Sequence, residues 1–123
     1  MIVRSYRDLE IYKEAIEIAS VIYTITRSFP KDETYGMRDQ IRRAVASIGA
    51  NVAEGFGRYH YKDKLVFFYN ARGSLYETMH FIELSLRVGY IVDTDREKLI
   101  SRLDKLSVRL NNFINSVGRQ NDS

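Results

Sequence analysis

The spacing Glu77-x-x-His80 is the pattern in this sequence that comes nearest to a metal site. Di-metal centres inside four-helix bundles use a glutamate and a histidine at this spacing on two helices, and a single glutamate on each of the other two. The second histidine, His60, has no glutamate three residues before it, so half of such a site is missing. We therefore expect no metal and no cofactor, and a partly exposed His80 on a helix surface.

Other catalytic chemistry has no better support. The chain has no cysteine, which excludes disulfides, thiolate catalysis and sulfur-ligated metals. No serine stands in a G-x-S-x-G turn of the kind that hydrolases use. Gly55-Phe-Gly57 has neither a strand pattern before it nor Gly-Lys-Ser/Thr after it, so it fits the end of a helix better than a phosphate loop. We expect a protein that is not an enzyme.

A line of polar residues runs beside an apolar line in the small-residue stretch SIGANVAEG, residues 47–55. No nucleophile, base or metal partner stands at a useful spacing from it, which favours a role in helix packing over a ligand site. Arg72, on the apolar line of a later segment, is expected to set the register by pairing with Glu17 or with an acid of a neighbouring subunit. The expected structural polar network comprises Gln40, Ser47, Asn51, Glu54, Arg72 and Glu77.

Glu54 raises a separate electrostatic question. It falls in the last turn of its expected helix, where the helix dipole disfavours an anion by roughly 0.3–1 kcal/mol. A cation is therefore expected beside it, and the candidates are Arg7, Arg58 and Lys62.

Basic residues are slightly in excess, with 19 Lys and Arg against 16 Asp and Glu and a net charge of +3. The tract Arg58-Tyr-His-Tyr-Lys62 interleaves basic and aromatic side chains, a combination that can stack bases and neutralise phosphates of single-stranded nucleic acid. In the alternative interpretation the tyrosines pack over the end of a helix bundle while the charges form a solvated face. The candidate nucleic-acid-binding residues are Arg38, Arg42, Arg43, Arg58 and Lys62.

Helical periodicity predicts the elements that carry these residues. Turn-forming residues divide the chain into four segments with apolar side chains at three- and four-residue spacing, and none with strand alternation. The expected helices cover about 5–28, 32–54, 61–88 and 94–117, and the tail 118–123 is expected to fray. Short connections between long helices predict an all-α, antiparallel up-down-up-down four-helix bundle in one domain, residues 1–123.

The expected helix ends rest on local signals. Ser5 with Asp8, and Thr94 with Glu97, have the spacing of capping boxes. Gly55 is expected to end the second helix in the left-handed conformation.

Two features indicate that the bundle assembles with copies of itself. The first helix carries two apolar lines that together cover more than half of its circumference, wider than a single core needs. The second helix carries an arc of small residues that would let another helix come close. That arc comprises Ala46, Gly49, Ala50 and Ala53.

The sequence also bears on location. The N-terminus, MIVRSYRDLE, is charged too early for the apolar core of a signal peptide, and no apolar run approaches the length needed to span a membrane. We expect a soluble, cytoplasmic protein without a membrane partner.

Short motifs spread over most of the chain together resemble one family. They are Tyr6-Arg-Asp-Leu9, Phe29-Pro30, Tyr35-Gly36-Met37, Gln40-Ile-Arg-Arg43, Ser47-Ile48, Asn51-Val-Ala-Glu-Gly55, Ala71-Arg-Gly-Ser-Leu-Tyr-Glu77 and Gly89-Tyr90-Ile91. With them the chain resembles the bacterial 23S rRNA intervening-sequence proteins, and more distantly the accessory variability protein of diversity-generating retroelements. The family usually has a serine or threonine cap before its third helix, where this chain has Tyr59-His60-Tyr61.

The resemblance implies a four-helix bundle that forms a ring-like homo-oligomer, most commonly a pentamer. It also implies an association with reading frames inserted in ribosomal RNA genes, without an established activity. The distant relative is a basic pentamer that binds nucleic acid, which makes RNA or DNA binding through backbone phosphates the leading functional hypothesis. The alternative is a scaffold or accessory protein that contacts a protein partner and binds no nucleic acid.

Overall fold

Four helices account for most of the chain. The computed structural model describes residues 2–122, with the side chains of 121 and 122 excepted. Within that range there are no strands, so the all-α prediction is confirmed. The helices are α1 (Glu10–Thr26), α2 (Met37–Gly57), α3 (Tyr61–Arg87) and α4 (Asp93–Asp122), with the 3-10 turns η1 (Tyr6–Asp8) and η2 (Lys31–Glu33).

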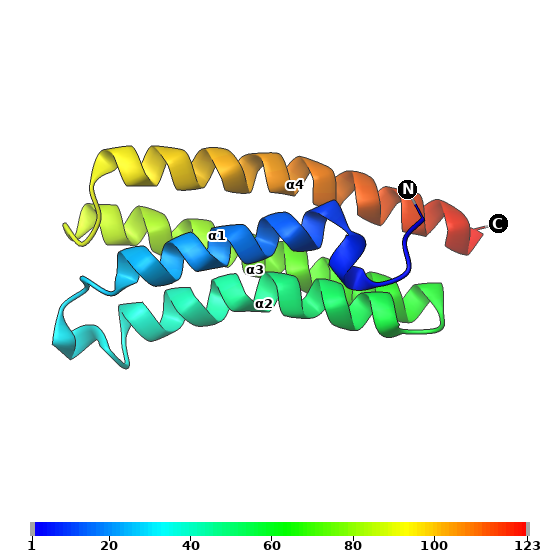
Figure 1. Cartoon of the computed structure of the whole chain (residues 1–123), viewed down its shortest axis with the longest axis horizontal. Helices are drawn as coiled ribbons and strands as arrows, with labels where there is room; N and C mark the ends of the chain where they lie inside the picture. The colour runs from blue at the N-terminus through cyan, green and yellow to red at the C-terminus, as the bar shows by residue number, and fades with distance from the viewer. Residues whose placement is uncertain (1, 123) are drawn as a thin grey trace.

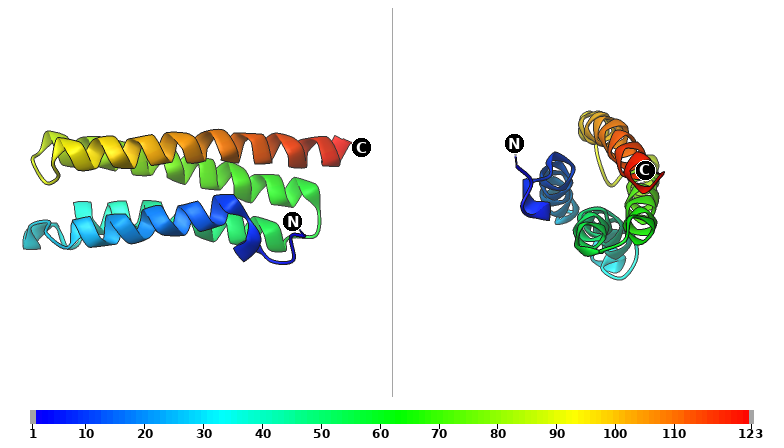
Figure 2. Two further views of the ribbon diagram at one scale, coloured as in Figure 1. Left: turned by 45° about the horizontal axis from the view of Figure 1, so that its top comes forward. Right: turned by 90° about the vertical axis from the view of Figure 1, so that its right-hand side faces the viewer.

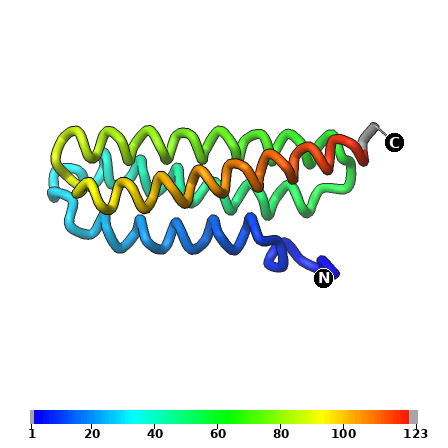
Figure 3. The backbone as a smooth tube through the Cα atoms, turned by 90° about the horizontal axis from the view of Figure 1, so that it is seen from above, coloured from blue at the N-terminus to red at the C-terminus, as the bar shows by residue number. Residues whose placement is uncertain are grey.

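The helices lie side by side along one long axis. The α1–α2 and α3–α4 connections lie at one end of the molecule and the α2–α3 connection lies at the other (Figures 1 and 3). Consecutive helices pack against each other, and α1 also meets α4, although this last seam is the least closely packed. Seen from the end, α1 and α4 stand apart from each other (Figure 2). We call the end with the α2–α3 connection the loop-23 end.

One apolar core fills the space between the helices. Its largest fully buried side chains come from every helix and include Ile18, Ile48, Leu75 and Leu106. The two apolar lines expected on the first helix have different surroundings. One line is buried in this core, whereas Ile16 and Tyr23 of the other remain 48% and 41% exposed.

The first two helices begin later than expected. Ser5 and Asp8 do form a capping box, but it caps the short turn η1. Leu9 is then extended, and α1 starts at Glu10 rather than at residue 5. Pro30 is followed by η2, so α2 starts at Met37 rather than at residue 32. Capping spacing marks where a turn begins, but the same hydrogen bonds serve a 3-10 turn and an α-helix.

Gly55 does not end α2, which continues to Gly57, so this expectation is wrong. Gly55 is buried where α2 meets α3, and a Cβ placed on it would lie 2.6 Å from Cε1 of Phe68 and 3.1 Å from Cβ of Phe67. The glycine is needed for the close approach of the two helices, not for a left-handed turn.

Gly89 is the left-handed glycine, with φ of 85°. Its N–H donates to the Leu86 carbonyl at 3.1 Å, and the N–H of Tyr90 donates to the Ser85 carbonyl at 2.8 Å. These are the two hydrogen bonds of a Schellman motif, and they end α3.

The fourth helix is longer at both ends than expected. It starts at Asp93, so Thr94 lies inside its first turn rather than capping it. The tail expected to fray stays helical through Asp122, and the rest of that prediction falls on Ser123, outside the described residues.

Replacing Gly55 with alanine should destabilise the fold. The new methyl group would press on the buried Phe68 ring, and overpacking of this kind costs about 1–3 kcal/mol, against about 1 kcal/mol gained from helix propensity. Urea unfolding followed by circular dichroism measures the difference. Gly57→Ala is the matched control, because a Cβ there meets nothing within 4 Å. Equal stability of the two variants would contradict this account of Gly55.

Candidate nucleic-acid interface

Arg38 is occupied by the end of the preceding helix. Its Nε donates to the carbonyl oxygen of Thr26 at 2.9 Å and its Nη1 to Oγ1 of Thr34 at 3.0 Å. Its Nη2 donates to the carbonyl oxygens of Phe29 and Pro30. A helix leaves its last four carbonyl groups without partners, and Arg38 supplies donors for the end of α1 and the turn after it.

Arg42, one turn further along α2, also donates hydrogen bonds to the end of α1. Its Nε donates to Oγ1 of Thr26 at 2.8 Å and its Nη2 to the carbonyl oxygen of Tyr23 at 3.1 Å. Its guanidinium carbon lies 4.7 Å from the centre of the Tyr23 ring, within cation–π range. Two of the five candidate nucleic-acid-binding residues are therefore bound to α1 within the chain.

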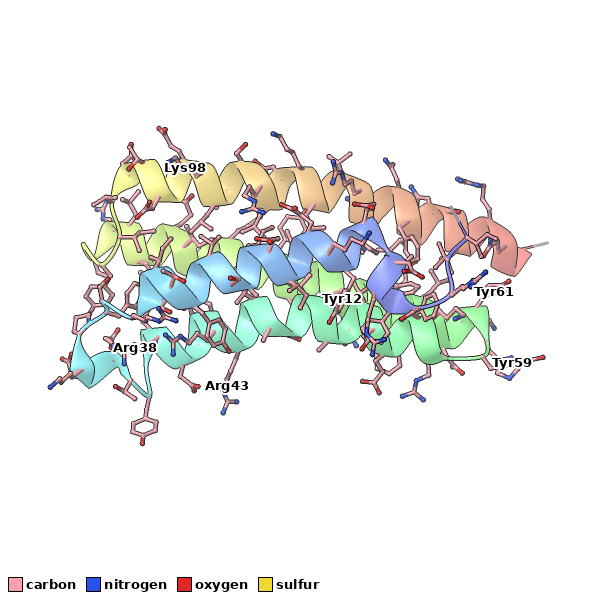
Figure 4. All side chains as sticks on the ribbon, in the orientation of Figure 1. Tyr12, Arg38, Arg43, Tyr59, Tyr61 and Lys98 are labelled. Atoms are coloured by element: carbon pink, nitrogen blue, oxygen red, sulfur yellow. The ribbon has the colours of Figure 1, made fainter. Side chains whose placement is uncertain are left out.

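Arg43 points away from the other helices (Figure 4). Its side chain is 80% exposed and, within the part of the chain that the structure describes, pairs only with Asp39, at 3.1 Å on the same helix. A surface pair of this kind contributes about 0–1 kcal/mol, so a phosphate can replace the aspartate at little cost.

The tract between Arg58 and Lys62 forms the α2–α3 connection and the start of α3. Tyr59 is 89% exposed and its ring meets that of His60 edge-on at 4.9 Å. Together with Tyr61 and Lys62 they line a hollow of about 490 Å³. Tyr59 thus extends from the loop-23 end instead of packing over it (Figure 4), and the interpretation in which it covers the bundle is wrong for this residue.

The two cations of this tract differ in their surroundings. Arg58 Nη2 pairs with Oε1 of Glu54 at 2.9 Å, and its guanidinium lies 4.5 Å from the Phe67 ring centre. Arg58 is thus the one of the three expected candidates that pairs with Glu54. Lys62 is exposed and forms no hydrogen bond or ion pair among the described residues.

Lys64 is a helix-capping side chain that the sequence analysis did not single out. Its Nζ donates to the carbonyl oxygens of Phe56 at 2.7 Å and Gly55 at 3.4 Å, so it caps α2 as Arg38 caps α1. Partial burial lowers the pKa of its amine below the usual value. A basic residue soon after a helix end was the available signal, but the same signal fits a solvated lysine.

Part of the expected polar network exists between α2 and α3. Oγ of Ser47 accepts hydrogen bonds from Nδ2 of Asn51 at 2.9 Å and from Oγ of Ser74 at 3.0 Å. Ser74 was not predicted, because its partner lies on another helix. Gln40 and Glu77 are exposed and lie outside this network.

Arg72 belongs to a different contact. Its Nη1 donates to Oδ1 of Asn111 on α4 at 3.0 Å, and its guanidinium lies 5.1 Å from the Tyr69 ring centre. The expected pairing with Glu17 is wrong, because Arg72 reaches the neighbouring helix α4, and α3 lies next to α2 and α4 but not next to α1. The other expected partner, an acid of a neighbouring subunit, stays a prediction.

Glu77 and His80 are both exposed on α3. Among residues 2–120, no three or more His, Asp or Glu side chains are grouped so as to hold a metal ion. In the described part of the chain, no helix combines the length and the hydrophobicity that crossing a membrane requires.

Comparison with known proteins identifies the family. The family model of the 23S rRNA-intervening sequence proteins matches residues 7–112. The chain belongs to this family. That confirms the resemblance carried by the sequence motifs.

A solved structure has the same fold as this chain. It is a protein with unknown function from the S23 ribosomal protein family of Bacteroides thetaiotaomicron. The two are 24% identical, with a TM-score of 0.78 over 85% of this chain and 95% of that one. No curated protein matches the chain.

Arg38→Met should destabilise the monomer fold. The change keeps the length of the side chain but removes the donor to the part-buried carbonyl group of Phe29 and one of the two donors to that of Thr26, which costs about 1–3 kcal/mol. Arg43→Met, on the same helix, should cost less than about 0.5 kcal/mol because it removes one exposed ion pair. Urea midpoints measured by circular dichroism compare them. A smaller loss for Arg38→Met than for Arg43→Met would refute the capping role.

Proposed function

We propose that this chain is the subunit of a cytoplasmic, non-enzymatic ring, a homopentamer of antiparallel four-helix bundles, that binds nucleic acid through backbone phosphates. The observation that carries the proposal is the composition of the loop-23 end. There an exposed tyrosine, Tyr59, and a lysine without a partner among the described residues, Lys62, line one hollow. Proteins that bind single-stranded nucleic acid without sequence preference combine aromatic side chains, on which bases stack, with basic side chains that contact phosphates.

The rest of the loop-23 end supports this location. The N-terminal segment lies at the same end and carries the exposed Arg4 and Arg7 (Figure 1). At the opposite end the two connections and the residues that flank them carry acids and bases in equal number, so they add no net positive charge. These acids are Asp32, Glu33, Asp93, Asp95 and Glu97. A polyanion would therefore be attracted to the loop-23 end and less so to the other.

The internal hydrogen bonds narrow the set of contact residues. Arg38 and Arg42 hold the end of α1, so their contribution to binding is indirect. Arg43, Arg58 and Lys62 remain as direct phosphate contacts, the first on the side of α2 and the others at the loop-23 end. In a ring the +3 charge of each subunit is repeated around the axis, so a modest patch becomes a broad one.

Binding should depend on Lys62 and Tyr59 in different ways. Lys62→Ala should weaken the binding of a short fluorescein-labelled single-stranded RNA and make its salt dependence shallower, because a phosphate contact is lost. Tyr59→Ala should cost about 1–3 kcal/mol of affinity, the usual contribution of one stacked base. Fluorescence anisotropy over a salt series measures both.

Lys98→Ala is the matched control, because Lys98 lies at the opposite end (Figure 4) and its loss should leave the affinity unchanged. No binding at low salt, or equal effects of all three variants, would overturn the proposed interface. Partners captured from cells that survive nuclease treatment, without RNA binding in vitro, would support the scaffold instead.

A further inference from the structure

The seam between α1 and α4 forms an apolar groove. Near the start of α4 it opens into a hollow of about 580 Å³ whose lining includes Val21, Ile25 and Leu99. Near the other end a second hollow of about 490 Å³ is lined by Leu9, Ile11 and Phe113, among others. Between the two, an ion pair joins Arg102 and Glu14 at 2.9 Å. The core therefore reaches the surface along this seam, and we call it the α1–α4 groove.

The exposed side of α3 is a second unusual surface. Val66, Tyr69 and Tyr76 are 54%, 47% and 54% exposed although they are large and apolar. Residues 66, 69, 73 and 76 are separated by three, four and three positions, which places them in one straight row on a helix. Gly73, inside the row, has open space around it. This row, which we call the α3 ridge, has the spacing of a helix face that packs against other helices.

We propose that the α3 ridge of one copy of this chain packs into the α1–α4 groove of the next copy. The inference rests on the homo-oligomer in the proposed function, and it names the two faces that meet. A ridge and a groove on different sides of the same molecule make a head-to-tail contact, which closes into a ring when the rotation between neighbours allows it. The contact buries the apolar area that both surfaces expose.

Charges at the ends of the two surfaces are complementary. The row of the ridge continues along α3 past Glu83, which pairs with Arg96, to Arg87. The lining of the groove includes the acids Asp95 and Glu97 and one lysine without an ion pair among the described residues, Lys98. Arg87, Asp95 and Glu97 form no ion pair within the described residues either. The end of α3 and the start of α4 lie at the same end of the molecule (Figure 1). Neighbours standing side by side around a ring axis would bring these opposite charges to the same level.

Pairing of two α3 ridges with each other is less favourable. If the two helices ran in opposite directions with their centres together, Lys62 of one copy would meet Arg87 of the other. If they ran in the same direction, Lys62 would meet Lys62 of the other copy and Arg87 would meet Arg87. Either way like charges face each other across the contact, which is unfavourable. The groove offers acids at the corresponding place and a concave apolar surface.

Complementary variants test the pairing directly. A ridge variant carries Val66→Glu and Tyr69→Glu, and a groove variant carries Val21→Glu. Each alone should be a monomer by size-exclusion chromatography with light scattering, whereas the wild-type chain is larger. Mixed together they should form a dimer with one copy of each and nothing larger, because only one intact ridge and one intact groove remain.

Controls keep the result interpretable. Ile16→Glu places the same charge on the other exposed side of α1 and should leave the wild-type assembly intact. Circular dichroism checks folding, and Ser101→Trp, which fills the groove from an exposed position on α4, replaces Val21→Glu if that variant does not fold. Variants that keep the wild-type mass, or a mixture that stays monomeric, would overturn the inference.

Two outcomes separate this inference from the proposed function. If the ridge variant is a monomer but the groove variant keeps the wild-type mass, the contact is between two ridges. That result would overturn the inference but not the oligomer. A monomeric wild-type chain would overturn both the inference and the ring. RNA binding by Lys62 and Tyr59 is measured separately and is decided by its own variants.

Discussion

The close approach of α2 and α3 is the contact on which the rest of the structure depends. Gly55 lets the Phe68 ring lie against the backbone of α2. About two helical turns earlier on α2, Ser47 shares a hydrogen bond with Ser74 of α3. With glycine and serine at these positions, the two helices pack more closely than any other pair. The short connection between them must then turn sharply, and it holds Tyr59 out from the loop-23 end.

Helix ends decide how the positive charge of this chain is used. Each helix leaves carbonyl groups without partners, and three basic side chains that could contact a polyanion are bound to them instead. Arg38 and Arg42 serve α1, and Lys64 serves α2. The cations that remain available, Arg43, Arg58 and Lys62, donate from their side chains to no main-chain carbonyl group among the described residues. For this reason the surface potential of the protein does not follow from a count of its lysines and arginines.

The packing of the four helices around the core is unequal, and this inequality creates the surfaces available to partners. On one side of the core α2 and α3 approach closely, and on the other side α1 and α4 stand further apart (Figure 2). Their seam leaves Val21 and Ile25 only partly buried, while α3 carries apolar side chains outward at Val66 and Tyr69. The α1–α4 groove and the α3 ridge are the two surfaces that the proposed contact between copies would join.

The sequence by itself determined the four helices, the main apolar lines and the family, because each depends on periodic or local patterns that a single chain displays. It also placed Arg58 among three candidate partners of Glu54, and only the structure shows which of the three forms the pair. Partners on other helices were not accessible in this way. Arg38 reaches α1, Arg72 reaches Asn111 and Gly55 meets Phe68 only because of how the helices are placed around the core. Tertiary structure alone decided which cations are free, because a carbonyl group twelve residues away can be reached only after the chain has turned back.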